Sequence, residues 1–416
     1  MALGLLAPIV GCHRYLVETP TLLQQQDSAQ VYASCPLHYQ TPDSPILYAT
    51  DRAVESGGDK NPVYGYGRAN SLAFGVANVS LNPHPTWKEL IEDTTGPKRS
   101  KAYELKLAGV HETGHIKPHL DQVMVSERGL EITKAVAEEI VQQRSQLYDL
   151  LESRLAQSAR KDVYIYVHGY NNSFENGVFR AAEIWHFMGR VGVPIAYSWP
   201  AGSGGLRGYA YDRESGEFTV SHLRHFIKTV AACPEVERVH LIAHSRGADV
   251  TISALRELHL SFLAQGKSTQ KELKLENLVL AAPDIDEDVF KQRFVAENLL
   301  NAARRTTIYV SNSDRAIETA DLIFHSRQRL GSLGIKDFSP KMRKALTKSP
   351  NVQFIECKLT TWAINHDYVF SHPAALSDLI LVLRDSRPPG AQYGRPLHQP
   401  AEGIWELRED YLTKAK

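Results

Sequence analysis

The chain of 416 residues has few cysteines, no excess of charge of either sign and no long hydrophobic run. Its four cysteines, Cys12, Cys35, Cys233 and Cys357, are scattered and form no Cys-x-x-Cys pair, which excludes a zinc ribbon or a dithiol redox motif. Basic and acidic residues number 47 each, so no overall field favours nucleic acid, and we expect no nucleic-acid partner. No apolar run reaches the roughly 20 residues of a membrane-spanning helix.

The overall composition, with 43% hydrophobic and 23% charged residues, is typical of a globular protein with a large core. The length allows two or three domains, but α/β folds often exceed the usual domain size. We expect an N-terminal segment over 1–40, one α/β domain over 41–385 and an extended C-terminal arm over 386–416. The arm is predicted from its proline and glycine residues.

The N-terminal segment contains Ile9-Val10-Gly11-Cys12, which resembles a bacterial lipobox preceded by an apolar stretch. On this interpretation Cys12 carries a lipid anchor, residues 19–40 form a tether, and the protein lies in the cell envelope, periplasmic or outer-membrane associated. The basic n-region of a signal peptide is missing. Two hypotheses therefore stay open: a lipoprotein whose start lies upstream, or a cytoplasmic protein with a buried N-terminal segment.

Hydrophobic periodicity predicts an α/β fold. Residues 46–52, 71–81 and 102–110 show the partial alternation of half-buried strands, and residues 130–155 have apolar positions every three to four residues, as in an amphipathic helix. Further strands are predicted at 163–167, 193–197, 239–243, 278–282, 307–310 and 352–359, and helices at 177–190, 217–231 and 247–259. Strands alternating with helices indicate a mostly parallel sheet covered on both faces.

Ala243-His244-Ser245-Arg246-Gly247 lies between a predicted strand and a predicted helix. A serine on such a tight turn is presented at the carboxyl edge of the sheet, beside the positive end of the helix dipole, and the flanking positions two residues before and after it must be small. Ala243 stands where glycine is usual. This pattern predicts a nucleophile elbow with Ser245 as the nucleophile; the alternative is an ordinary serine in a strand-to-helix loop.

His168-Gly169-Tyr170-Asn171-Asn172 follows the strand at 163–167. In esterase-like sites a backbone N–H from this loop and one from the residue after the nucleophile stabilise the oxyanion. We therefore expect an oxyanion hole from the amides of Tyr170 and Arg246.

The acid and the base of a triad should follow later strands, in the order serine, acid, histidine. Asp314, after the strand at 307–310, is the preferred acid. Asp284, with Asp286 nearby, is the alternative acid, and Asp284 is otherwise explained as a helix N-cap. His366 follows the last strand and is the predicted base, with His372 as its competitor.

His111-Glu112-Thr113-Gly114-His115 matches the H-E-x-x-H pattern of zinc metallopeptidases. That chemistry needs both histidines on one helix turn, whereas Gly114 and Pro118 oppose a helix. Nothing fixes Glu131 or Glu138 as a third ligand. A polar loop at a sheet edge is the favoured interpretation.

Together these segments resemble the DUF900 esterase/lipase-like family of the α/β-hydrolase superfamily, over roughly residues 45–385. The matching segments are Tyr48-Ala49-Thr50-Asp51-Arg52, Leu72-Ala73-Phe74-Gly75, Tyr166-Val167-His168-Gly169-Tyr170-Asn171, Tyr197-Ser198-Trp199-Pro200, Ala243-His244-Ser245-Arg246-Gly247, Ala281-Ala282-Pro283-Asp284, Tyr309-Val310-Ser311-Asn312-Ser313-Asp314-Arg315-Ala316 and His366-Asp367-Tyr368. The resemblance implies the α/β-hydrolase fold and a Ser-Asp-His triad, and implies little about substrate.

The sequence thus predicts a serine hydrolase that cleaves a small-molecule or lipid ester without metal or organic cofactor. Residues 201–215 and 316–350 are expected to form the walls or lid of its pocket. Two other functions stay open: a non-catalytic, envelope-associated binding protein on the same fold, and the zinc metallopeptidase.

Overall fold

A computed structural model describes residues 15–25, 28–57, 61–117, 123–126, 129–202, 204–312, 314, 329–334, 337, 340–359 and 366–413. Cys12 and the lipobox-like segment lie outside the described residues, as do residues 316–328 of the expected pocket wall. Within the described ranges, no helix is long and apolar enough to cross a membrane.

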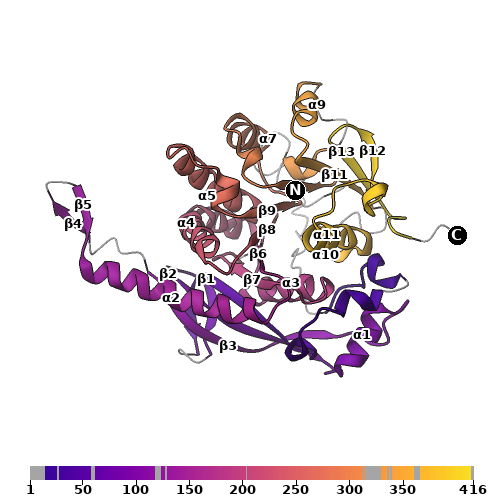
Figure 1. Cartoon of the computed structure of the whole chain (residues 1–416), viewed down its shortest axis with the longest axis horizontal. Coiled ribbons are helices and arrows are strands. Elements are labelled where there is room, and N and C mark those ends of the chain that lie inside the picture. Colours follow the sequence, from indigo (N-terminus) through magenta and orange to yellow (C-terminus); the bar gives the residue numbers. More distant parts are fainter. Residues whose placement is uncertain are drawn as a thin grey trace, which may run out of the picture.

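The described strands build one mixed sheet of eleven strands, in the order β12-β13-β11-β10-β9-β8-β6-β7-β1-β2-β3 (Figure 1). Its strands are β1 (Ser44–Ser56), β2 (Val63–Asn82), β3 (Glu104–Ile116), β6 (Asp162–Val167), β7 (Val193–Ser198), β8 (Arg238–His244), β9 (Leu275–Ala281), β10 (Arg305–Val310), β11 (Val352–Lys358), β12 (His398–Ala401) and β13 (Ile404–Arg408). All neighbours from β13 to β1 are parallel, whereas β12, β2 and β3 pair antiparallel. A separate hairpin joins β4 (Val123–Ser126) to β5 (Gly129–Ile132).

The central strands are buried on both sides, which explains their nearly continuous hydrophobic sequence. In β6, Val163, Ile165 and Val167 pack into one core cluster, while Tyr164 and Tyr166 pack into the other. This period of two follows from the pleat of the strand. Both faces of the sheet are therefore apolar, and a layer of helices covers each face.

Helices α2, α4, α5 and α7 supply or flank the first cluster, and α1, α3, α10 and α11 supply the second (Figure 1). Their bounds are α1 (Trp87–Thr95), α2 (Lys134–Ala156), α3 (Phe174–Phe187), α4 (Gly205–Ala232), α5 (Arg246–Leu263), α6 (Thr269–Glu272), α7 (Glu287–Phe290), α9 (Pro340–Thr347), α10 (Tyr368–Ser371) and α11 (Pro373–Asp385). The predicted fold class, a mostly parallel sheet with helices on both faces, is confirmed.

Helix α4 differs from its prediction, because it begins at Gly205 and so includes the second half of the glycine-rich segment expected to be a loop at 201–208. Glycine has low intrinsic helix propensity, but packing of an apolar face outweighs it. Leu223, Phe226 and Ile227 of this helix are buried in the core. Part of the predicted pocket wall over 201–215 is therefore a helix.

The predicted tether over 19–40 packs on the domain. Short 3₁₀ turns cover Thr21–Gln24, Ser28–Tyr32 and Leu37–Tyr39, and Leu23 and Tyr39 are buried. The Leu22 amide donates to Oγ of Ser377 in α11 at 2.9 Å, and Nη1 of Arg190 donates to the Tyr39 carbonyl at 2.8 Å. Because Leu23 and Tyr39 are buried in the second core cluster, the described part of this segment covers that core.

The predicted C-terminal arm also differs, because β13 pairs parallel with β11 and extends the sheet. Arg395, fully buried, forms a two-pronged ion pair with Asp378 of α11 at 2.8 and 2.7 Å. Such a bidentate pair fixes geometry as well as charge. A pattern of prolines and glycines at 387–400 does not reveal this long-range pair.

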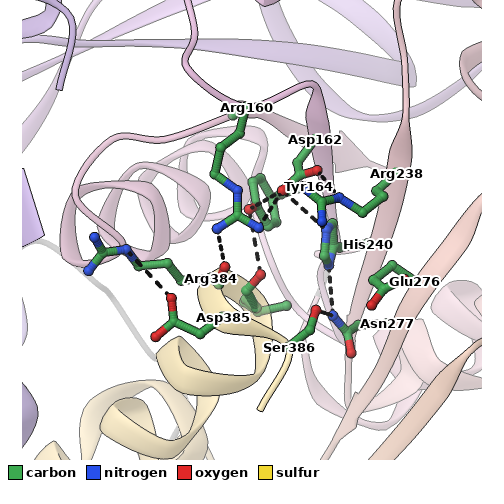
Figure 2. Close-up of polar contacts among 12 residues, drawn as sticks. Arg160, Asp162, Tyr164, Arg238, His240, Glu276, Asn277, Arg384, Asp385 and Ser386 are labelled. Atoms are coloured by element: carbon green, nitrogen blue, oxygen red, sulfur yellow. Dashed lines mark hydrogen bonds and ion pairs between the residues drawn. The ribbon is translucent and has the colours of Figure 1, made fainter. Parts of the chain in front are cut away.

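The amino ends of the strands carry a buried ionic network (Figure 2). Asp162 at the start of β6 accepts from Nε of Arg238 at 2.6 Å and pairs with Arg160 at 2.7 Å. Asn277 of β9 bridges the His240 ring, at 2.9 Å, and Oγ of Ser386 after α11, at 3.0 Å. The network ties the end of α11 to three strands, at the edge of the sheet opposite to Ser245.

Candidate active site

Ser245 occupies a sharp turn between β8 and α5, with φ of 52° and ψ of −124°. A positive φ is rare for a residue with a side chain and stores backbone strain. Backbone hydrogen bonds hold the turn: the Ser245 amide donates to the Ala281 carbonyl at 3.0 Å, and the Ser245 carbonyl accepts from the Asp284 amide at 3.1 Å. The turn has the conformation of a nucleophile elbow.

Two glycines allow the elbow to pack against the loop after β6. A Cβ atom on Gly247 would lie 2.3 Å from the His168 carbonyl oxygen, and one on Gly169 would lie 2.7 Å from Cβ of Ser245. Real Cβ atoms do not approach so closely. Both positions therefore require glycine, and Gly169 lies directly against the serine.

The sheet topology places this contact at a crevice. Strands β6 and β8 are neighbours, but α3, which follows β6, packs on one face, whereas α5, which follows β8, packs on the other. Loops that leave adjacent parallel strands toward opposite faces open a ligand-binding crevice at the carboxyl edge. Ser245 and Gly169 lie at this switch point.

The imidazole of His366 is hydrogen bonded to Asp314, with Nδ1 and Oδ2 2.7 Å apart. The Asp314 side chain is fully buried and follows β10, and the His366 side chain is mostly buried, just before α10. An ionised carboxylate only accepts, so Nδ1 carries the proton and Nε2 keeps its lone pair. The structure brings together the preferred acid and base of the sequence prediction.

His244 links this pair to the elbow. Its Nε2 donates to the His366 carbonyl at 3.3 Å, and the two imidazole rings are 5.0 Å apart between centroids. Burial, with a smaller effect of His366, lowers the pKa of His244 to about 4. His244 is therefore neutral near pH 7 and can donate this hydrogen bond.

The charges around the His366 imidazole and its burial have opposite effects on its pKa. Burial lowers the pKa of His366, but the carboxylates, first Asp314 and then Asp284 and Asp367, raise it above the ordinary value. The balance stabilises the protonated imidazolium, which is the form a general base takes after accepting a proton.

Asp284, the alternative acid, has other partners. Its Oδ1 pairs with Arg329, and its Oδ2 accepts from the Tyr209 hydroxyl at 3.0 Å. The other explanation of Asp284, a helix N-cap, is wrong: Asp286 caps α7 and accepts from the Asp288 and Val289 amides at 2.9 and 3.1 Å. The cap lies two residues later because the Asp284 carboxylate is bound by Arg329 and Tyr209.

His372, the competing base, caps a helix. Its Nδ1 accepts from the Ala374 amide at 3.2 Å, at the start of α11. Burial lowers its pKa, which favours the neutral, accepting form. The contact of His372 within α11 gives it a local structural role.

The loop at 168–172 is held from α4. Asp212 accepts from the Asn171 amide at 2.9 Å and from the Gly202 amide at 3.1 Å, and Asn171 has a left-handed φ of 53°. The Tyr170 ring lies 5.4 Å from the Tyr209 ring. Tyr170 lies between Gly169, which touches Ser245, and this anchored Asn171.

Arg246 is the first residue of α5 and follows Ser245 directly. The first four amides of a helix have no partner within the helix, so the Arg246 amide is available in principle to an anion. Its guanidinium turns back to Asp249, at 3.0 Å. The Arg246 amide thus follows Ser245 in the chain, and the Tyr170 amide follows Gly169, which packs against Ser245.

Arg52 supports the loops around the site through buried hydrogen bonds, whereas the sequence analysis named it only as part of a family motif. It is 1% exposed and donates to the carbonyls of Asn172 at 2.6 Å and Ala201 at 2.8 Å, and to Oγ of Ser198 at 2.9 Å. A charged arginine in the middle of a strand pattern is unusual in a core. An arginine within an apolar strand pattern is therefore the sequence feature from which a structural role of Arg52 could have been predicted.

The H-E-x-x-H segment lies in strand β3, so both the zinc helix and the predicted loop are wrong. A bulge in its pairing with β2 puts Glu112 and His115 on one side, 2.6 Å apart. Glu112 also accepts from the Tyr64 hydroxyl at 2.7 Å. The described residues include no group of three His, Cys, Asp or Glu side chains placed to hold a metal ion.

Two solved structures were found to be similar over part of the chain. A lipase-esterase related protein from Clostridium acetobutylicum ATCC 824 is similar in structure, with 11% identity, a TM-score of 0.31, and coverage of 54% of this chain and 95% of that one. A protein assigned as a hydrolase from Agrobacterium vitis S4 has 14% identity, a TM-score of 0.25, and coverage of 40% and 77%. No curated protein matches the sequence.

The family comparison is more extensive. Residues 143–384, more than half of the chain, match the family described as alpha/beta hydrolase of unknown function (DUF900). The matched region contains Ser245, Asp314 and His366 together with the strands that carry them. The chain therefore belongs to the DUF900 family of α/β hydrolases.

Proposed function

We propose that this protein is a serine hydrolase of carboxylic esters, with Ser245 as nucleophile, His366 as general base and Asp314 as the acid of the triad. One observation carries the proposal: the 2.7 Å contact of His366 with Asp314, in a loop joined through His244 to the strained turn of Ser245. These are the parts that acyl transfer requires.

In the proposed reaction, Oγ of Ser245 attacks the ester carbonyl while Nε2 of His366 takes its proton. The C–O bond to the alcohol then breaks, and the proton passes from His366 to the leaving oxygen. Water, deprotonated by His366, attacks the acyl-enzyme. The bond between the acyl carbon and Oγ of Ser245 breaks, His366 returns the proton to Oγ, and the acid is released. Asp314 keeps the imidazole in the required tautomer and stabilises its charged form.

We assign the stabilisation of the oxyanion to the backbone amides of Tyr170 and Arg246. Support comes from the packing of Gly169 against Ser245, which leaves no side chain between the loop and the nucleophile. Anchoring of Asn171 by Asp212 would keep the Tyr170 amide in place before substrate arrives. Such preorganised donors are usually the largest electrostatic contribution to acyl transfer.

The substrate class is proposed as a small-molecule or lipid ester, since hydrolases of this fold most often act on carboxylic esters. A chain-length series of p-nitrophenyl esters, run beside a fluorophosphonate probe, tests this. Wild-type protein should hydrolyse at least one ester and label at Ser245, whereas Ser245→Ala should do neither and keep its melting temperature.

A folded wild-type protein that neither labels nor hydrolyses any ester in the series would favour the non-catalytic binding protein. Retention of more than about a tenth of wild-type turnover in Ser245→Ala would exclude Ser245 as nucleophile.

A further inference from the structure

Arg180, on the buried side of α3, binds the residue that follows His366. Its Nη2 donates to Oδ2 of Asp367, and its Nη1 donates to Oε2 of Glu183 at 2.8 Å. The Arg180 side chain is only 3% exposed, and its Cζ lies 5.1 Å from the centre of the Phe370 ring. The guanidinium therefore has one orientation, fixed by two carboxylates and an aromatic face.

The second carboxylate is itself anchored. Oε1 of Glu183 accepts from the Val17 amide at 3.0 Å, and the side chain of Glu183 is 1% exposed. Burial lowers the pKa of Arg180, but Asp367 and Glu183 raise it above its ordinary value, so the arginine stays charged. A rigid chain of contacts thus runs from the N-terminal segment through α3 to Asp367.

Asp367 determines how the His366 loop enters α10. Its carbonyl accepts from the Phe370 and Ser371 amides, both at 3.0 Å, and so starts the helix. A shift of Asp367 would move the adjoining His366. The imidazole would then lose its contact with Asp314 and the position beside Ser245 that the proposed function requires.

We propose that Arg180 is a positioning residue for His366 and acts through Asp367. The inference rests on the proposed function, because it assigns Arg180 a task in the reaction of Ser245. Arg180 does not touch the reacting atoms: it fixes the loop that carries the base and balances the charge of Asp367 beside it.

The charge balance gives a signature that a merely structural role would lack. Without Arg180, the carboxylate of Asp367 is unbalanced, and the pKa of His366 should rise. Without the Asp367 charge, the pKa of His366 should fall. The charged and titratable groups around His366 are Asp314 after β10, Asp284 after β9, His244 at the end of β8 and Asp367 on its own loop. Arg329, which follows β10, pairs with Asp284, and Arg180 on α3 pairs with Asp367.

The experiment compares Arg180→Met, Arg180→Lys and Asp367→Asn with Arg190→Met as the matched control. Arg190 is also a buried arginine near the end of α3, but it binds the carbonyls of Tyr39, Thr41 and Asp43. The full-length variants are assayed for kcat, KM and the pH profile of kcat/KM with the best p-nitrophenyl ester.

Arg180→Met should lower kcat by about 10- to 100-fold, the cost of an angstrom-scale misplacement, with KM little changed and the acid limb of the profile moved to higher pH. Asp367→Asn should also lower kcat but move the limb to lower pH. Arg180→Lys should recover part of kcat, because it restores the positive charge with poorer geometry. Arg190→Met should lower the melting temperature and leave kcat and the limb unchanged.

Unchanged kcat and an unmoved limb in both Arg180→Met and Asp367→Asn would overturn the inference while wild-type hydrolysis still supported the proposed function. If Arg180→Met fails to fold, Asp367→Asn decides, because Asp367 is partly exposed and its predicted limb shift has a defined sign. An inert wild-type protein would instead refute the proposed function.

Discussion

The Asp314 carboxylate lies 2.7 Å from Nδ1 of His366, although the two residues are 52 positions apart in the chain. Asp314→Asn replaces this acceptor with an amide that can favour the wrong imidazole tautomer. Turnover should therefore fall by about four powers of ten, with little change in fold. Ester kinetics and the melting temperature of the purified variant are the measurements.

Asp284→Asn is the companion variant and should show the reverse pattern. It removes the charge that pairs with buried Arg329, and breaking a buried pair costs roughly 3 kcal/mol or more of stability. Turnover should fall far less than in Asp314→Asn. An inactive Asp284→Asn beside an active Asp314→Asn would reverse the assignment of the acid.

The pH dependence of catalysis follows from the same pair. In the proposed reaction His366 must be neutral to accept the proton of Ser245, and nearby carboxylates raise its pKa above the ordinary value. The acid limb of kcat/KM should therefore lie above pH 6.5, the usual histidine value. Asp284→Asn removes one of these charges, so the limb should move to lower pH. A limb below the ordinary histidine value would contradict the assignment.

Gly169→Ala tests the contact between the loop that carries the proposed oxyanion amide and Ser245, the proposed nucleophile. The added methyl group would lie 2.7 Å from Cβ of Ser245, so either the loop or the serine must move. We expect kcat to fall by about 100-fold, as for other displacements of this size. Gly109→Ala is the control, since a Cβ atom there meets nothing within 4 Å. Equal kcat in both variants would show that the loop is not part of the site.

Asp162→Asn tests the ionic network at the opposite edge of the sheet (Figure 2). Burial raises the pKa of Asp162, but His240, Arg160 and Arg238 outweigh it and lower the pKa to about 2. The stabilisation is present above the unfolded-state pKa, about 4, and is lost as pH falls through the folded-state value. At pH 7 it amounts to about 2 kcal/mol.

The free energy of unfolding, measured with urea at several pH values, should therefore be lower in Asp162→Asn at pH 7. The difference should shrink between about pH 4 and pH 2. Asp385→Asn, at the same corner but partly exposed, should cost less than about 1 kcal/mol. A penalty for Asp162→Asn that does not depend on pH would assign the effect to packing alone.

The sequence by itself determined the parallel core of the sheet and the position of the elbow. Both depend on local patterns: apolar runs such as β6 must be buried on both faces, and the tight turn requires small residues two positions before and after Ser245, here Ala243 and Gly247. The order serine, acid, histidine also follows from strand order, which places Asp314 and His366 at one edge.

Tertiary structure alone decided which acid meets His366, because the carboxyl ends of β9 and β10 both offer one and the choice depends on side-chain direction. It also decided that Asp286, and not Asp284, caps α7, and that His111 and Glu112 lie in a strand. The contacts of Arg52 and Arg180 join residues far apart in the chain. Such long-range pairs of buried charges leave no periodic pattern in the sequence, so only the folded chain reveals what they hold.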